Sequence, residues 1–231
     1  IVDTFKPEHL VWHDLLDGYS INPHHASNPF ASIAKIRNDR ADVKAEVTRA
    51  VAFLEKHTPM KTISVIVPSN HDDFLARWIV NTDWRTQPGN AEFYLRTALA
   101  MVQGTQFGDA GTSYPFPFSY WGKESLEDPG FRFLERDESF TLADVELGMH
   151  GDIGPNGARG SIKNLRRIGI KSIIGHSHSP GIDEGCYQTG TSTRLRLEYN
   201  VGASSWLNTH CLLYANGKRT LINIIDGEWR L

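Results

Sequence analysis

The sequence has little cysteine, no excess of basic residues and no long hydrophobic run. Its 231 residues include two cysteines, Cys186 and Cys211, too few for the disulfide framework of a small secreted protein. No apolar stretch approaches the roughly 20 residues that cross a bilayer, so we expect no membrane partner. The formal net charge of −3 supplies no basic field to attract nucleic acid, although a metal-centred site binds phosphate without one. These absences predict a cytoplasmic protein.

The start of the sequence also lacks a targeting segment. The first ten residues, "IVDTFKPEHL", have no basic start, no long apolar core and no initiator methionine. We therefore expect the sequence to come from the middle of a longer chain. Its length and its 40% hydrophobic content predict a single domain, residues 1–231, with a sizeable core.

Short apolar strands alternate with helices along most of the chain, which is the pattern of an α/β fold. The aromatic, proline-rich segment 114–122 predicts an irregular loop that covers the site or, less simply, stacks bases. The tail, with segment 193–202 and the hairpin dipeptide Asn216-Gly217, predicts β structure. We expect strands at 9–14, 63–67, 140–150 and 170–178, and helices at 41–57, 72–80, 91–102 and 161–169.

Polar clusters follow the predicted strands. They read "HDLLD" (13–17), "SNHDD" (69–73), "MHGD" (149–152) and "GHSH" (175–178). Strand ends are where open α/β sheets build their ligand crevice. Carboxylate, amide and imidazole groups together suit Mn, Fe, Zn or Ni better than calcium, which prefers oxygen alone. The two imidazoles of the last cluster, one residue apart, can reach neighbouring positions of a two-metal centre.

In this order the four clusters resemble the signature of the calcineurin-like metallophosphoesterase superfamily. That signature runs Asp-x-His, Gly-Asp-x-x-Asp, Gly-Asn-His-Asp/Glu, a single His and Gly-His-x-His, and its last four blocks match from Asp14 to His178. The wording around "NPHH" (22–25) is more similar to phage members, some of which act in DNA transfer or degradation, and this implies the host cytoplasm. The resemblance implies a four-layer α/β/β/α sandwich and a phosphodiesterase, with DNA as one candidate substrate.

The resemblance also implies roles for individual residues. His71 resembles the imidazole that contacts the phosphate and helps the leaving group, with Asp72 or Asp73 orienting it. Manganese is the expected metal, with iron, zinc and nickel as alternatives. The residues that resemble metal ligands are Asp14, which bridges two ions, Asn70, His150 and His176 on one ion, and His178 on the other.

The chain departs from the family pattern in two ways. His13 and Ser69 stand where the family has glycine, a change that is tolerated where the backbone needs no positive φ. The first block, Asp-x-His, is missing, because only thirteen residues precede Asp14 and none fits it. We therefore expect the sandwich to lack its first strand and helix, or the site to be degenerate. The complete protein would then bind two ions, and this chain one, with little activity.

Each candidate residue also has a structural alternative. Asp14 can cap a strand end, Asn70 can serve a turn, and the three histidines 150, 176 and 178 can lie in ordinary turns or on the surface. His24, His25 and Arg159 divide evenly between solvent exposure and contact with a substrate phosphate. The functional alternatives to a phosphodiesterase are a small-molecule phosphatase and a catalytically impaired module for binding or assembly.

Overall fold

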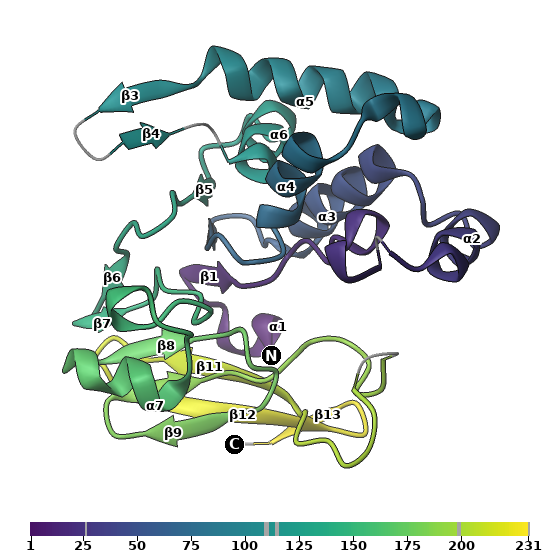
Figure 1. Cartoon of the computed structure of the whole chain (residues 1–231). Coiled ribbons are helices and arrows are strands. Elements are labelled where there is room, and N and C mark those ends of the chain that lie inside the picture. Colours follow the sequence, from purple (N-terminus) through teal and green to yellow (C-terminus); the bar gives the residue numbers. More distant parts are fainter. Residues whose placement is uncertain (26, 109–110, 114–115, 198–199, 231) are drawn as a thin grey trace. The chain divides into compact units, whose positions relative to one another are not determined.

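The structure, a computed structural model, is a mixed α/β fold with several sheets and helices (Figure 1). It describes residues 1–25, 27–108, 111–113, 116–197 and 200–230. The chain divides into two compact units: residues 8–134, the N-terminal unit, and residues 1–7 with 135–231, the C-terminal unit. The expectation of one domain over 1–231 stays a prediction. Among the described residues, no helix combines the length and apolarity needed to cross a membrane.

The N-terminal unit is built on a three-stranded parallel sheet. Its order is β1-β2-β5, from β1 (His9–Trp12), β2 (Ile63–Ile66) and β5 (Phe131–Phe133). Val65, Ile66 and Val67 are almost fully buried, as expected for a β-branched run in a parallel strand that is covered on both faces. The strands predicted at 9–14 and 63–67 are confirmed. Because β1 and β2 are parallel neighbours, the segments that follow them leave the same edge of the sheet.

Helices surround this sheet where the periodicity predicted them. Helix α3 (Val43–His57) buries one face, formed by Val43, Val47, Val51 and Leu54. It begins where the Asp42 side chain accepts the Ala45 N–H. The predicted helices at 41–57, 72–80 and 91–102 are confirmed. The unit also contains α2 (Pro29–Arg37), α4 (Asp73–Asn81), α5 (Ala91–Gln103), α6 (Pro117–Ser125), the hairpin β3 (Gln106–Gly108) and β4 (Gly111–Ser113), and the short 3₁₀ turns η1 (Tyr19–Ile21), η2 (Pro23–His25), η3 (Trp84–Thr86) and η4 (Pro88–Asn90).

The aromatic segment 114–122 is not a loop from Pro117 onward, so that prediction is wrong there; residues 114–115 lie outside the described residues. Pro117 starts α6, since proline at the first helical position loses no hydrogen bond. Phe118 is 1% exposed, and Trp121 stacks on Phe93 at 4.9 Å between ring centroids. Burial in the core of the N-terminal unit outweighed the loop-like composition. The rings of Phe118 and Trp121 therefore pack within this unit, and they form neither a cover over the site nor a base-stacking platform.

The C-terminal unit contains a mixed five-stranded sheet and an antiparallel three-stranded sheet, which lie next to each other in Figure 1. Arg219 joins them, because its guanidinium donates to the Ser172 carbonyl at 3.0 Å and to the Gly185 carbonyl. The sheets have the orders β6-β7-β8-β10-β9 and β11-β12-β13, from β6 (Thr141–Leu142), β7 (Val145–Glu146), β8 (Ser172–Ile174), β9 (Gly181–Asp183), β10 (Cys186–Gln188), β11 (Asn208–Leu213), β12 (Arg219–Ile225) and β13 (Glu228–Arg230), with α1 (Val2–Phe5), η5 (Pro155–Gly157), α7 (Ile162–Leu165) and η6 (Arg166–Ile168).

Several predictions for this unit are confirmed. The hairpin closes at Asn216-Gly217, where Tyr214 N–H donates to the Lys218 carbonyl at 2.9 Å, and Gly217 has a φ of +79°. The helix predicted at 161–169 is present as α7 and η6, and the Ser161 hydroxyl accepts the Asn164 N–H. The strand predicted at 140–150 is instead the short hairpin of β6 and β7, which turns at Ala143 and Asp144, both with positive φ. The strand predicted at 170–178 is limited to β8, because the chain turns before His176.

The segment 193–202 does not form a strand in its described residues, 193–197 and 200–202, so that prediction is wrong. Side chains close a local loop instead. Arg196 donates to the carbonyls of Asn200 and Gly202, and the Asn200 side chain accepts the Leu197 N–H at 2.7 Å. Such side-chain bonds to nearby backbone compete with a sheet ladder.

Candidate metal centre

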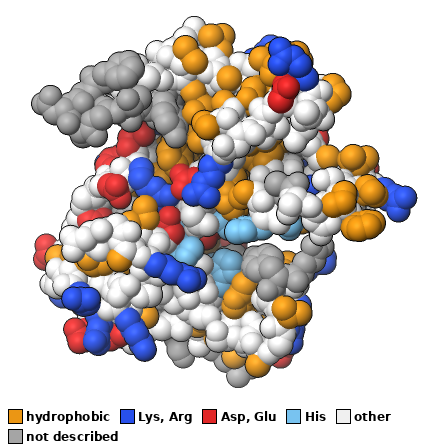
Figure 2. All heavy atoms as spheres, viewed as in Figure 1, with side chains coloured by type: hydrophobic (Ala, Val, Ile, Leu, Met, Phe, Trp, Pro, Cys, Tyr) orange, Lys and Arg blue, Asp and Glu red, His pale blue; other side chains and the backbone are white. Residues whose placement is uncertain are grey.

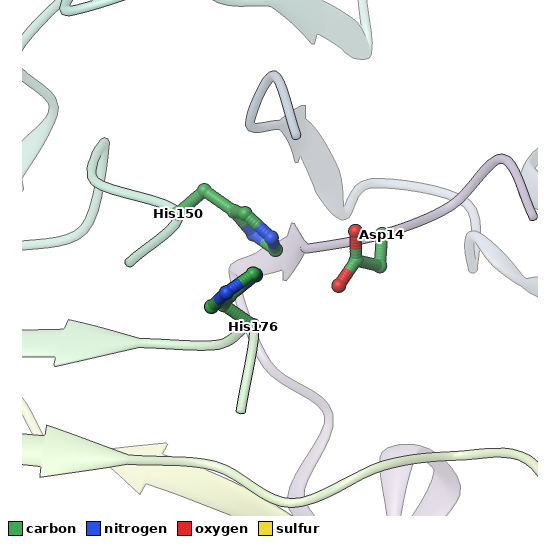
Figure 3. Close-up of side chains that lie close together, drawn as sticks. All are labelled: Asp14, His150 and His176. Atoms are coloured by element: carbon green, nitrogen blue, oxygen red, sulfur yellow. The ribbon is translucent and has the colours of Figure 1, made fainter. Parts of the chain in front are cut away.

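Two imidazoles come together at the ends of neighbouring parallel strands in the C-terminal unit. His150 follows β7 and His176 follows β8, and these strands pair in parallel. The rings of His150 and His176 lie 5.3 Å apart between centroids, at 79° to each other (Figure 3). A backbone bond from Gly175 N–H to the His150 carbonyl at 2.8 Å holds the two segments together. His150 is 3% exposed, so an ion bound here would be shielded from water on one side.

The "GHSH" turn has an unusual backbone. His176 has a φ of +67° and His178 a φ of +59°, in the left-handed region that few residues other than glycine adopt. Ser177 N–H donates to the Gly175 carbonyl at 2.8 Å and tightens the turn. Strained backbone of this kind is concentrated at ligand-binding sites, because the surrounding structure must hold it. The turn brings both imidazoles to one pocket.

This pocket has a volume of about 560 Å³ and belongs to the C-terminal unit alone. One side is formed by the turn from Gly151 to Ser161. Gly160 is required there, because a Cβ on it would lie 1.9 Å from the Gly151 carbonyl oxygen. The side chains that line the pocket include those of Arg159, Ser161, His176, His178, Gln188 and Trp206.

Asp152 and Arg166, which do not line the pocket, form ion pairs. Asp152, which follows His150 in the "MHGD" cluster, forms an ion pair with Arg136 at 3.1 Å, and its carboxylate therefore stabilises this turn. Arg166 pairs with Asp183 at 2.8 Å and with Glu184 at 3.2 Å, and the Asp183 bond raises the pKa of the guanidinium above its usual value. Arg159 has no carboxylate partner among the described residues.

The N-terminal unit presents the other predicted site residues after its parallel strands. Asp14 lies two residues beyond β1 with a φ of +50°; Figure 3 also labels it. Asn70 and His71 lie in the turn between β2 and α4. That turn is fixed by the buried Asp72, whose carboxylate accepts the Ser69 N–H at 2.8 Å. Asp72 thus shapes the backbone that carries both residues.

The His71 ring is oriented by a backbone group. Its Nδ1 lies 2.9 Å from the carbonyl oxygen of Asp17, which only accepts, so Nδ1 carries the proton and Nε2 points to the opposite side of the ring. The ring also stacks on Phe74 at 5.0 Å. Burial raises the pKa of the Asp17 carboxyl, and Glu46 adds to this effect. The hydrogen-bonded edge of His71 is therefore fixed by the "HDLLD" cluster.

The remaining candidates differ in exposure. His24 is exposed, and its N–H donates to the Asn22 side chain. His25 is half-buried and packs edge-on against Tyr19 at 5.3 Å. Their contact with a substrate stays a prediction. Sequence reasoning missed Gln188 and Trp206, since neither lies in a motif or shows a periodic pattern that points to a site.

Comparison with known proteins gives one informative similarity. The chain is 34% identical over 231 residues to a protein named Protein A1 of Escherichia phage T5, an alignment that covers 99% of this chain and 41% of the phage protein. The chain thus spans about two fifths of the length of the curated relative that it matches. No protein-family model and no solved structure matches the chain.

Proposed function

We propose that the chain is the metal-binding part of a phosphoesterase that hydrolyses phosphodiester bonds within a metallophosphoesterase sandwich. The observation that carries the proposal is the pair His150 and His176, whose rings lie 5.3 Å apart at the ends of parallel strands. The "GHSH" turn, in which the backbone of both histidines lies in the left-handed region, supports the proposal, because the motif resembles the last block of the family signature.

The donor set fits a divalent transition metal. Asp14, His150 and His176 each offer one ligand atom, a carboxylate oxygen or an imidazole nitrogen, and in the proposal they bind one ion with the help of Asn70. His178 serves a second ion. One carboxylate among neutral ligands leaves the ion electrophilic, and manganese, iron, zinc and nickel accept such mixed sets. When bound, such an ion stabilises phosphoryl charge as a Lewis acid and acidifies water.

The protein's own residues supply the remaining steps. Arg159 binds a phosphoryl oxygen of the substrate through its guanidinium. His71, with Nδ1 directed at the Asp17 carbonyl, donates the proton on Nε2 of its imidazolium form to the leaving-group oxygen. Proton donation of this kind contributes about 10²- to 10⁴-fold to the rate.

The proposal is tested by hydrolysis assays with the full-length natural protein. The substrates are a phosphate bis-ester, a phosphate mono-ester, and single- and double-stranded DNA, each with Mn²⁺ and with EDTA. We expect turnover of a diester with Mn²⁺ alone. His71→Ala should lower kcat by about 10²- to 10⁴-fold, whereas His57→Ala, which removes an exposed imidazole from the end of α3, should leave kcat unchanged.

Metal binding is measured separately by calorimetry with Mn²⁺. His176→Ala should weaken binding at least tenfold relative to His57→Ala, because it removes one ligand. No turnover of any substrate by the full-length protein, or full activity of His71→Ala, would refute the enzyme. Binding of Mn²⁺ without turnover would favour the alternative of a binding or assembly module.

A further inference from the structure

We propose that the pocket of the C-terminal unit binds a nucleotidyl group, with the base stacked on the Trp206 indole and the phosphate bound by Arg159. The inference rests on the proposed function, since it assigns a substrate class to the same site. A nucleotide combines an anion with a flat aromatic ring, and the pocket lining combines a guanidinium with an indole.

Trp206 is fixed beside the histidine turn by several contacts. Leu207 N–H donates to the His178 carbonyl at 3.3 Å, and Thr191 N–H donates to the Leu207 carbonyl at 2.9 Å. The Trp206 ring meets the His178 ring edge-to-face, with 4.3 Å between centroids and 88° between planes. The indole is therefore held next to the imidazole that the proposed function assigns to a second metal ion.

Arg159 also lines the pocket, and two contacts hold its backbone. Its carbonyl accepts a bond from the Asn164 side chain at 2.8 Å, and residue 159 forms a β-bridge with Ile153. The backbone of Arg159 is thus fixed while its side chain is exposed. Arg136 and Arg166 are neutralised by carboxylates, whereas Arg159 has no such partner among the described residues. Its charge is available for a phosphate.

The charges on the surface favour a small or single-stranded ligand over a duplex. On the face that Figure 2 shows, Lys and Arg side chains are interspersed with Asp and Glu and do not gather into one basic stripe. Duplex binding usually depends on such a stripe, whereas stacking on an aromatic side chain tolerates any base and needs no large field. The pocket therefore fits one nucleotide at the end of a strand, or a free nucleotide.

The test compares two phosphates that differ only in the base. Calorimetry in EDTA measures binding of 2′-deoxyadenosine 5′-monophosphate and of 2-deoxyribose 5-phosphate to the full-length protein. Stacking of one base predicts that the nucleotide binds about 5- to 150-fold more tightly. Equal affinities, or no detectable binding of the nucleotide, would overturn the inference without any variant.

Variants then locate the effect. Trp206→Ala should remove the difference between the two ligands, and Trp206→Phe should keep most of it, because phenylalanine retains a stacking face. Trp84→Ala changes a tryptophan of the N-terminal unit and serves as the matched control, with no expected effect. Arg159→Ala should weaken both ligands equally, whereas Arg167→Ala, an exposed arginine outside the pocket, should not. A base preference that survives Trp206→Ala would refute the role of Trp206.

The outcome is separable from that of the proposed function, because no turnover is measured. Base-dependent binding without hydrolysis would leave this inference standing and would refute the phosphodiesterase. Hydrolysis of diesters with equal binding of nucleotide and sugar phosphate would do the reverse. If Trp206→Ala does not fold, as judged by circular dichroism, the Trp206→Phe variant and the comparison of ligands on the natural protein decide.

Discussion

The turns that carry the candidate residues are held in different ways in the two units. In the N-terminal unit, carboxylates accept backbone N–H groups: Asp72 accepts from Ser69 at 2.8 Å, and Glu46 accepts from Tyr19 at 2.8 Å and Ser20 at 2.9 Å. In the C-terminal unit, the histidine turns are held by bonds from backbone to backbone. The first arrangement depends on particular side chains and their charge, the second on backbone path and on glycine.

This difference predicts which substitutions each unit tolerates. A polar substitution should disturb the N-terminal turns, whereas adding a Cβ should disturb the C-terminal ones. The C-terminal unit also uses charge. The Glu146 carboxylate accepts the N–H groups of Phe140 at 3.0 Å and Gly148 at 2.7 Å, and Arg136 and Asp152 form an ion pair. That pair lies beside the turn that ends at Gly160, whose N–H donates to the Asp152 carbonyl at 2.8 Å, so charge and backbone act together there.

The largest expected effect is that of Gly160→Ala. The new Cβ would lie 1.9 Å from the Gly151 carbonyl oxygen, which forces the backbone apart, and we expect a loss of about 3 kcal/mol in the free energy of unfolding. Urea unfolding followed by circular dichroism measures it. Gly89→Ala, where nothing lies within 4 Å of the new Cβ, should change stability by less than about 0.5 kcal/mol. Similar stability of the two variants would show that the turn adapts and would remove half of the comparison.

The next effect is that of Asp72→Ala. It leaves the buried Ser69 N–H without its acceptor, and a loss of about 2 kcal/mol follows. Asp72→Asn keeps one acceptor oxygen but not the charge, and should cost about 1 kcal/mol. Asp39→Asn is the control, because Asp39 is exposed and its φ of +53° also suits asparagine. Hydrogen exchange at the Ser69 amide should become faster in Asp72→Ala and stay unchanged in the control Asp39→Asn. An unchanged rate would show that the backbone holds this turn as well.

The sequence predicted the parts of this arrangement that follow from local patterns. The strands β1 and β2 were predictable because β-branched runs such as Ile63 to Val67 suit a buried parallel strand and stop at Pro68. The polar clusters at strand ends were visible for the same reason, and these include His150 and His176. What the clusters bind is not encoded in the pattern, and their resemblance to one superfamily remains the source of the functional proposal.

Other features depend on contacts between distant residues. Trp206 reaches the pocket through the bond of Leu207 to His178, a partner that no local pattern reveals. The helix α6 was missed because prolines and aromatics resemble a loop in composition, whereas burial of Phe118 decides the structure. The turn at residues 69–72 was expected, but the acceptor role of the Asp72 carboxylate was not, since it needs the actual backbone path.

The smallest expected effect concerns the charge of Lys35 and tests how far side-chain electrostatics stabilise the N-terminal unit. Lys35 is 7% exposed and donates to the Ser20 carbonyl at 3.2 Å, in the loop that Glu46 also holds. Burial lowers the pKa of its amine below the usual value, and Glu46 partly offsets this. Below the lowered pKa, the amine is charged in the folded and the unfolded chain, and burial penalises only the folded one.

As the pH rises from the lowered pKa to the unfolded value near about 10.4, the folded chain releases this proton before the unfolded chain does. The unfolded state then binds more protons, so stability increases with pH over this window. Lys35→Met should remove this increase, measured as the difference in unfolding midpoint between pH 8 and pH 10, and Lys56→Met, at an exposed position on α3, should not. An identical pH response in both variants would mean that the amine contributes only a hydrogen bond. The contrast between the units would then rest on the carboxylates Asp72 and Glu46 alone.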